Sequence, residues 1–339
     1  MIQNLLLERV VQSEKTKLGR LVLMTIIKLE KHFSMNVIAM ESKVLKVKLL
    51  PDIGFKMVSL EYKPKKKEFM FQPLNKKYEI PFYGEDFEKY DTSGLDEMIP
   101  TIVKCVYPEG MYKGSILPDH GDVWSIPWNA NCMDNTVKGK VSLKSLPLDF
   151  FKALTFQEEN LLRIDYEVEN LSSKNISFLW TLHGLNVFDD ETKLILPNEG
   201  NKILNVYEND VLGYIGQVNT FPFAKDINGA IIDLTLLKSY KDNKSYKYYF
   251  LNPIKYGEVG LHYIKDNIMY LMKYDVEKIP YLGVWITKGG FKGEYNCAIE
   301  PSNGFYDSLE LAFKNKKVKK LNPFEKTSWT IFIEVKENI

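Results

Sequence analysis

The stretch LLRIDYEVEN, from Leu161 to Asn170, decides the fold class, because apolar and charged residues alternate along it. The two alternating sets are Leu162, Ile164, Tyr166 and Val168 on one side and Arg163, Asp165, Glu167 and Glu169 on the other. A period of two residues is that of a β-strand with one buried and one wet face. The stretch therefore predicts a strand at the surface of a sheet.

The same pattern continues on both sides of this stretch. A polar turn (170–175) follows it, and the run ISFLWTLH (176–183) alternates again, so we expect an antiparallel hairpin. Five further stretches share the texture and are rich in β-formers: KVLKVKLL (43–50), MVSLEYK (57–63), YLGVWITK (281–288), EYNCAIE (294–300) and WTIFIEVK (329–336). The chain is thus predicted to be made mainly of antiparallel strands.

Helical signals are weak. Only the first ten residues and KSLPLDFFKALTF (144–156) are candidates for short helices, and a proline interrupts the second. Many strands without crossover helices favour an all-β fold, a large antiparallel sandwich with few short helices. We expect residues 1–42 to form an N-terminal segment and first strands of the same domain as residues 43–339.

The charge and arginine content of the chain indicate which kinds of molecule it is less suited to bind. The 339 residues carry a formal net charge of +1, with charges of both signs mixed along the chain, which argues against nucleic acid or an anionic membrane as partner. The arginines are confined to Arg9, Arg20 and Arg163. Because arginine is the preferred bidentate ligand of phosphate, a dedicated phosphate site is disfavoured. Lysine can still bind phosphate, so a phosphorylated ligand stays open.

The cysteines and the N-terminus indicate a cytoplasmic protein. Cys105, Cys132 and Cys297 are odd in number and widely spaced, which does not suit a disulfide framework. We see no signal peptide and no run of about 20 apolar residues that could span a bilayer. A homodimer is left open.

The stretch LPDHGDVWSIPW (117–128) concentrates rare residues. It holds His120, Trp124 and Trp128, although the whole chain has four histidines and five tryptophans. Its prolines and glycine predict a loop or strand edge. Such density in a loop indicates a binding site rather than packing alone.

Three further residues stand where strands could present them to a cleft. His183 lies on the odd face of its strand, opposite the apolar even positions; a surface histidine is the commoner interpretation of such a position. Glu300 lies next to Pro301 at a strand end, where a solvated carboxylate is again the plainer interpretation. Trp285 faces away from Val284, either to fill the core or to stack on the C–H surface of a sugar.

Asp96 and Glu97 are adjacent acids between apolar flanks, and we expect one of them to turn inward and find a hydrogen-bond partner. Which one does so is left open. The chain has no metal-ligand spacing, no nucleophile elbow and no glycine-rich phosphate loop. These residues therefore favour an acid–base site that acts on a polyol without metal or cofactor.

Taken in order, these segments resemble the galactose mutarotase superfamily, the aldose 1-epimerase-like proteins. The matching pieces are GLDEMIPTI (94–102), LPDHGDVWSIPW (117–128), LWTLHGLNVF (179–188), LGVWITKGGF (282–291) and CAIEPSNG (297–304). The resemblance covers roughly Lys43 to Val335. Each motif is moderately specific, and their common order makes the resemblance much stronger than any one of them.

The resemblance implies a large antiparallel β-supersandwich with a sugar site on its concave face. It implies an enzyme that interconverts the α and β anomers of an aldose through ring opening. By motif, Glu300 would be the base that deprotonates the C1 hydroxyl, and His183 the acid that protonates the ring oxygen. His120 would bind hydroxyls and help to stabilise charge near the ring oxygen. No cofactor is implied.

Substrate contacts are expected from a second set of residues: Asp96, Trp124, Trp285 and Asn186. Asn186 is included because the family has an aromatic residue and an asparagine after the second histidine, where this chain has Gly184, Leu185 and Asn186. The partner expected from all of these is a small-molecule sugar.

Two departures from the family pattern leave the substrate open. The family's arginine before the first histidine is missing, since no arginine lies between positions 20 and 163; Lys104 or Lys113 could replace it. The family's additional aspartate has no clear counterpart, with Asp266 and Asp275 as candidates. The alternatives are a non-catalytic carbohydrate-binding protein on the same fold and a hexose-phosphate 1-epimerase.

Overall fold

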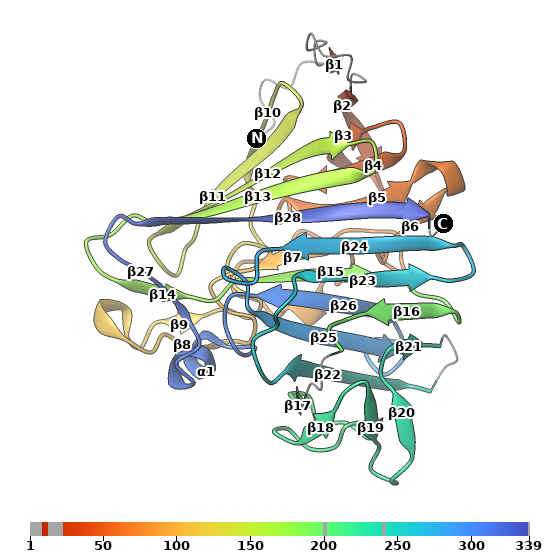
Figure 1. Cartoon of the computed structure of the whole chain (residues 1–339). Coiled ribbons are helices and arrows are strands. Elements are labelled where there is room, and N and C mark those ends of the chain that lie inside the picture. The colour runs from red at the N-terminus through yellow and green to blue at the C-terminus, as the bar shows by residue number, and fades with distance from the viewer. Residues whose placement is uncertain (1–8, 13–22, 199–201, 239–241, 338–339) are drawn as a thin grey trace.

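The computed structural model describes residues 9–12, 23–198, 202–238 and 242–337, and two large antiparallel sheets dominate it (Figure 1). In spatial order, the described strands of the first sheet are β1 (Arg9–Gln12), β2 (Met24–His32), β3 (Met35–Glu41), β4 (Leu45–Leu50), β5 (Lys56–Tyr62), β7 (Leu95–Met98), β15 (Thr181–Asn186), β26 (Tyr295–Ser302), β25 (Tyr281–Lys288), β22 (Lys244–Phe250), β17 (Lys202–Asn205) and β18 (Val218–Thr220). The short β6 (Lys67–Glu68) also pairs with β5. Strand β3 pairs with β4, so the N-terminal strands and the following segment share one sheet.

The second sheet covers one face of the first. In spatial order its described strands are β10 (Asn129–Met133), β11 (Thr136–Ser142), β12 (Leu148–Glu158), β13 (Leu161–Asn170), β28 (Lys326–Glu337), β24 (Ile268–Tyr274), β23 (Glu258–Tyr263), β16 (Thr192–Ile195) and β21 (Leu236–Leu237). The alternating stretch LLRIDYEVEN is β13, with Ile164, Tyr166 and Val168 buried. The predicted all-β sandwich is confirmed.

The remaining elements are short. Three small strand pairs are β14 (Ile176–Phe178) with β27 (Lys319–Leu321), β19 (Phe223–Lys225) with β20 (Ile231–Asp233), and β8 (Cys105–Val106) with β9 (Ile116–Leu117). The helical turns within the described residues are α1 (Leu309–Lys314), η1 (Lys63–Lys65), η2 (Phe87–Lys89) and η3 (Gly110–Tyr112). None of the helices described here has the length and apolar character needed to cross a membrane.

Two local expectations are wrong. Strand β13 pairs with β12 and β28 instead of forming a hairpin with the run that follows it. That run divides into β14 and β15, and β15 belongs to the first sheet, so the turn after β13 carries the chain from one sheet to the other. The segment 144–156 is largely strand β12, because Phe150, Leu154 and Phe156 recur at the period of a strand and are buried. The other candidate helix, residues 1–10, lies outside the described residues except for the first two residues of β1.

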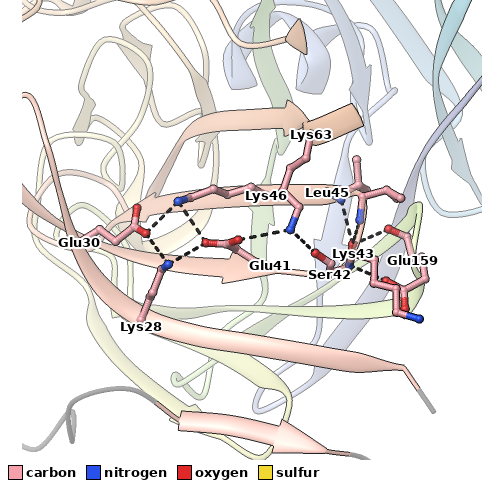
Figure 2. A network of polar contacts seen from close by, with 10 residues as sticks. Lys28, Glu30, Glu41, Ser42, Lys43, Leu45, Lys46, Lys63 and Glu159 are labelled. Carbon is pink, nitrogen blue, oxygen red and sulfur yellow. Dashed lines mark hydrogen bonds and ion pairs between the residues drawn. The ribbon is translucent and has the colours of Figure 1, made fainter. Parts of the chain in front are cut away.

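Lysine–glutamate pairs link neighbouring strands at the N-terminal end of the first sheet (Figure 2). Glu41 of β3 lies 3.0 Å from the ammonium group of Lys28 on β2 and 3.1 Å from that of Lys46 on β4. Glu30 contacts the same two lysines. Burial opposes ionisation of Glu41, but its hydrogen bonds to Lys28 and Lys46 outweigh burial and lower its pKa to about 2. The network thus stabilises the register of these three strands.

An ion pair lies between the two sheets. Lys152 of β12 places its Nζ 2.7 Å from Glu97 Oε1 of β7, and neither side chain is exposed to solvent. The hydroxyl of Tyr166 on β13 donates to the same carboxylate at 2.9 Å. Glu97 therefore points toward the second sheet, and its neighbour Asp96 points to the opposite face of the first sheet because side chains alternate along a strand.

Candidate active site

A cavity of about 380 Å³ opens on the face of the first sheet that points away from the second. Its floor is made by β15, β25, β26 and β22, and its walls by the segments around residues 86–92, 102–103, 119–120 and 305–307. Residues directly opposite one another on paired strands share a face. His183 opposes Asp96, Leu185 opposes Ala298, and Gly283 opposes Glu300. The register itself thus gathers polar side chains from distant parts of the chain on this floor.

His183 and Glu300 meet in this cavity. The Nε2 atom of His183 lies 3.8 Å from Oε1 of Glu300. Both side chains line the cavity, yet Glu300 is fully buried and His183 is 8% exposed. Glu300 is not a surface carboxylate at a strand end, because β26 continues through Pro301, which opposes Leu282 of β25. An imidazole and a carboxylate at this separation can exchange protons with one small ligand between or above them.

His120 lies beside this pair. Its ring stacks on Phe87 at 4.3 Å between centroids and meets the ring of His183 edge-on at 5.6 Å. Its Nδ1 atom is 2.9 Å from Asp119 Oδ2. Because an ionised carboxylate only accepts, Nδ1 carries a proton there, and Nε2 is left for a ligand. Burial would raise the pKa of Asp119, but the hydrogen bonds from His120 and the Phe87 backbone outweigh burial and lower it.

Backbone geometry explains why glycine follows His120. Both residues have positive φ, 56° for His120 and 75° for Gly121. Gly121 also forms a bridge to Ile99, and a Cβ atom placed on it would lie 2.2 Å from the Ile99 carbonyl oxygen. The loop can therefore approach the first sheet closely enough to bring His120 to the cavity.

We expect Gly121→Ala to destabilise the fold and to displace His120. The clash is with backbone, which cannot turn aside, so overpacking of this kind should cost about 1–3 kcal/mol. Chemical denaturation measures the loss. The matched control is Gly114→Ala, which also has positive φ but nothing within 4 Å of its Cβ position. Equal stability of the two variants would contradict the close-approach explanation.

Lys247 bridges two carboxylates in the cavity. Its Nζ atom is 2.9 Å from Glu300 Oε2 and 2.9 Å from Asp307 Oδ1. The hydroxyl of Tyr249 donates to the same Asp307 oxygen at 3.0 Å. Lys247 stands on β22 and Glu300 on β26, so the lysine spans the strand between them. Gly283 on that strand leaves room for the Glu300 carboxylate, because a Cβ there would lie 3.1 Å from Glu300 Oε2.

The surroundings change the proton affinity of the central pair. Burial lowers the pKa of His183 well below its ordinary range, and the nearby charges of His120 and Lys247 lower it further. Burial raises the pKa of Glu300, although Lys247 opposes this. Burial thus disfavours the charged form of both groups, and because they lie 3.8 Å apart their titrations are coupled.

Aromatic side chains form the other wall. Trp285 lines the cavity from β25, with Tyr207 and Phe291 edge-on to its ring at 5.5 Å and 5.7 Å. Its Nε1 donates to Asn296 Oδ1 at 3.3 Å, and Asn296 donates to Glu294, which also lines the cavity. The indole face is thus held in position beside the polar floor, as sites for sugars require.

Three predicted contact residues do not line the cavity. Asp96 opposes His183 and points to the same face of the sheet, but it is buried beside the cavity, 3.1 Å from Lys56. Trp124 packs edge-on against Phe87, and its Nε1 donates to the Asp119 carbonyl. Both residues therefore contact or adjoin residues of the cavity without lining it.

Asn186 points to the other face of the first sheet and donates to the Phe69 carbonyl. Its even position, shared with Leu182 of the same strand, already predicted this orientation. The prediction that Asn186 contacts the substrate rested on the family resemblance alone, and it is wrong because the side chain lies on the opposite face from His183.

Lys247, Asp307 and Phe87 line the cavity but were not among the predicted site residues. Lys247 and Tyr249 alternate with the core residues of KSYKYYF (244–250), and this alternation is the signal that could have found the lysine. Asp307 follows Glu300 in the chain, whereas an aspartate was sought before it. Lys104 and Lys113 are exposed and do not line the cavity, and Asp266 pairs with Lys67 elsewhere. Asp275 does not line it either.

The sequence matches no protein-family model, and no curated protein is significantly similar to it. Solved structures do match it. A candidate aldose 1-epimerase from Klebsiella pneumoniae is 14% identical, with a TM-score of 0.69 over 98% of this chain and 88% of that one. A galactose mutarotase related enzyme from Lactobacillus acidophilus is 13% identical, with a TM-score of 0.63 over 89% and 97%.

A galactose mutarotase-like protein from Clostridium acetobutylicum is 14% identical, with a TM-score of 0.61 over 92% of this chain and 98% of that one. At these identities the likeness concerns the fold. It extends over nearly the whole of both chains in each case, so the match is to a complete architecture and not to a shared sandwich core. The protein therefore has the galactose mutarotase-like fold that its sequence motifs predicted.

Proposed function

We propose that this protein is an aldose 1-epimerase-type isomerase that interconverts the α and β anomers of an unphosphorylated sugar. The observation that supports it most is the contact between His183 and Glu300 inside a cavity of suitable size, with His120 beside them. Ring opening needs one proton removed from the C1 hydroxyl and one delivered to the ring oxygen. A coupled acid–base pair supplies both.

The proposed reaction needs Glu300 ionised and His183 protonated. Burial disfavours both charged forms, and Lys247, 2.9 Å from Glu300, stabilises the ionised carboxylate. Glu300 takes the proton of the C1 hydroxyl, the C1–O bond of the ring breaks, and His183 protonates the ring oxygen. The C1–C2 bond of the resulting open-chain aldehyde rotates, and the reverse proton transfers close the ring on the other face. His120 donates to hydroxyls through the side of its ring that Asp119 leaves free, and Trp285 offers an aromatic face to the sugar.

The charge of the cavity disfavours a phosphorylated substrate. Among the described residues that line it, the acidic ones are Asp86, Glu88, Asp119, Glu294, Glu300 and Asp307. Lys247 is the lysine in this lining, and it is already committed to two of those carboxylates. A phosphate would meet repulsion there. The hexose-phosphate alternative is therefore ranked below a neutral sugar.

The test is anomer exchange followed by NMR across a panel of aldoses and their phosphates. Acceleration of a neutral sugar supports the proposal, and acceleration confined to phosphates overturns its substrate class. If no sugar is accelerated but sugar resonances broaden on addition of protein, the non-catalytic binding protein is the correct alternative.

We expect His183→Asn to lower kcat/KM for the accelerated sugar by about 10²–10⁴-fold, the usual contribution of a positioned acid or base. Asparagine keeps polarity but cannot carry the proton. His262→Asn, a histidine on β23 of the second sheet, is the matched control and should keep the wild-type rate. A wild-type rate in the His183 variant would remove His183 from the mechanism.

A further inference from the structure

Lys247 occupies a place that the resemblance does not account for. Its ammonium group lies midway between Glu300 and Asp307, 2.9 Å from an oxygen of each, and its side chain is 11% exposed. The two oxygens that it contacts belong to different segments, one on β26 and one on the loop that follows it. A lysine so enclosed has exchanged water for these two partners.

Surrounding residues hold the two partners of Lys247 in place. The missing side chain at Gly283 leaves room for the Tyr249 ring and the Glu300 carboxylate, and the Tyr249 hydroxyl holds Asp307 in position. The backbone oxygen of Asp307 also accepts from the Ile102 and Val103 amides, which ties the loop to the cavity wall. Each partner of Lys247 is thus fixed by contacts of its own.

We propose that Lys247 is a positioning residue that fixes the Glu300 carboxylate and, balanced by Asp307, sets how readily the His183–Glu300 pair accepts its proton. This inference rests on the proposed function, since it concerns the same acid–base pair. Lys247 need not touch the sugar to act. Its charge operates on both members of the pair, because a nearby cation disfavours protonation of a carboxylate and of an imidazole alike.

The other charged and titratable groups around the pair stay the same in the test. From β22 Tyr249 faces Glu300, and burial keeps its pKa well above the ordinary value, so it remains neutral. His120 faces the pair from the 119–121 loop, held by Asp119. On β7, Asp96 is directly opposite His183 in the sheet and forms an ion pair with Lys56 of β5. Of these groups Tyr249 lies beside Lys247, with the ammonium group 5.8 Å from the centre of its ring, but Tyr249 is neutral, so the Lys247 and Asp307 variants change one charge each.

Two substitutions should move the pH dependence of kcat/KM in opposite directions. The rate requires the pair to hold one proton, so it falls at low pH when a second proton binds and at high pH when the last one leaves. Lys247→Met removes a positive charge, so both limbs should move to higher pH, by about 1–3 units for a charge in contact. Asp307→Asn removes a negative charge and should move both limbs to lower pH.

Controls separate this role from simple support of the fold. Lys247→Arg keeps the charge and should leave the limbs within a fraction of a unit of wild type. A structural role would lower the rate at every pH and leave the limbs in place, and that result in Lys247→Met overturns the inference. If Lys247→Met does not fold, Asp307→Asn decides alone, because it preserves shape and hydrogen bonds; unmoved or upward-moved limbs in it are then the overturning result.

A second readout does not depend on turnover. With ¹³C-carboxyl-labelled glutamate, the Glu300 signal can be assigned by its loss in Glu300→Gln and titrated in each variant. Lys247→Met should move its midpoint to higher pH and Asp307→Asn to lower pH. These shifts in a protein that accelerates no sugar would sustain the inference about Lys247 while the proposed function fails. Unmoved midpoints would overturn the inference whether or not sugars are turned over.

Discussion

Glu300→Gln should reduce the rate of anomer exchange by about 10²–10⁴-fold while the protein stays folded. The amide has the shape of the carboxylate but cannot accept a proton from the C1 hydroxyl. Lys247 retains Asp307 as a partner in this variant, so no buried charge is left alone. NMR exchange spectroscopy measures the rate, and chemical denaturation checks the stability.

Glu334→Gln is the matched control for this experiment. Glu334 is also a glutamate that pairs with a lysine, at 2.8 Å from Lys273, but it lies on β28 of the second sheet and does not line the cavity. Its replacement should leave the exchange rate at the wild-type value. Full activity of Glu300→Gln would mean that the carboxylate is not the base, whatever its position in the cavity.

The largest expected effect on stability comes from the ion pair between the two sheets. Glu97→Leu or Lys152→Met alone should destabilise the fold by about 3–5 kcal/mol, because each leaves the other charge buried without its partner. Burial already raises the pKa of Glu97, and Lys152 is the charge that most opposes this. Urea denaturation of each variant measures the loss.

The double variant with both replacements should recover much of that stability. Two apolar side chains of similar size in place of a buried ion pair are often neutral or stabilising. The interaction energy from the double-mutant cycle should then be large and favourable in sign to the pair. Losses that simply add would contradict direct coupling between Glu97 and Lys152.

The sequence was sufficient for the fold class because alternation is local. The residues of β13 alternate strictly, and the structure has the predicted strand at that place. Pairing is not local, and this is why the expected hairpin was wrong: nothing in the polar turn after β13 says that the next strand joins the other sheet. The error at β12 was of another kind: Phe150, Leu154 and Phe156 do alternate locally, but the apolar Phe151 and Ala153 between them obscured the strand pattern, and the segment was taken for a weak helix.

The two histidines and the glutamate of the cavity could be predicted from the sequence, but the residues that contact them could not. His120, His183 and Glu300 stand in recognisable motifs, and the structure brings them to one cavity. Lys247 stands in no such motif, and its contact with Glu300 crosses the intervening strand β25, where Gly283 leaves room for the carboxylate. Such a relation between three strands appears only when the register is known. Trp124 was misjudged because a loop residue can be as buried as a core residue.

The register that builds the cavity floor also determines the stage of folding at which the floor can form. Strand β15 is paired with β7 about 90 residues before it and with β26 more than 100 residues after it, and β13 pairs with β28 near the C-terminus. Pairings so distant in sequence make folding slow, on the scale of milliseconds to seconds or longer. A chain synthesised only as far as residue 299 already contains β15 and β25, the partners of β26, but it lacks Glu300, Asp307 and β28. The cavity that holds His183 and Glu300 is therefore a late product of folding.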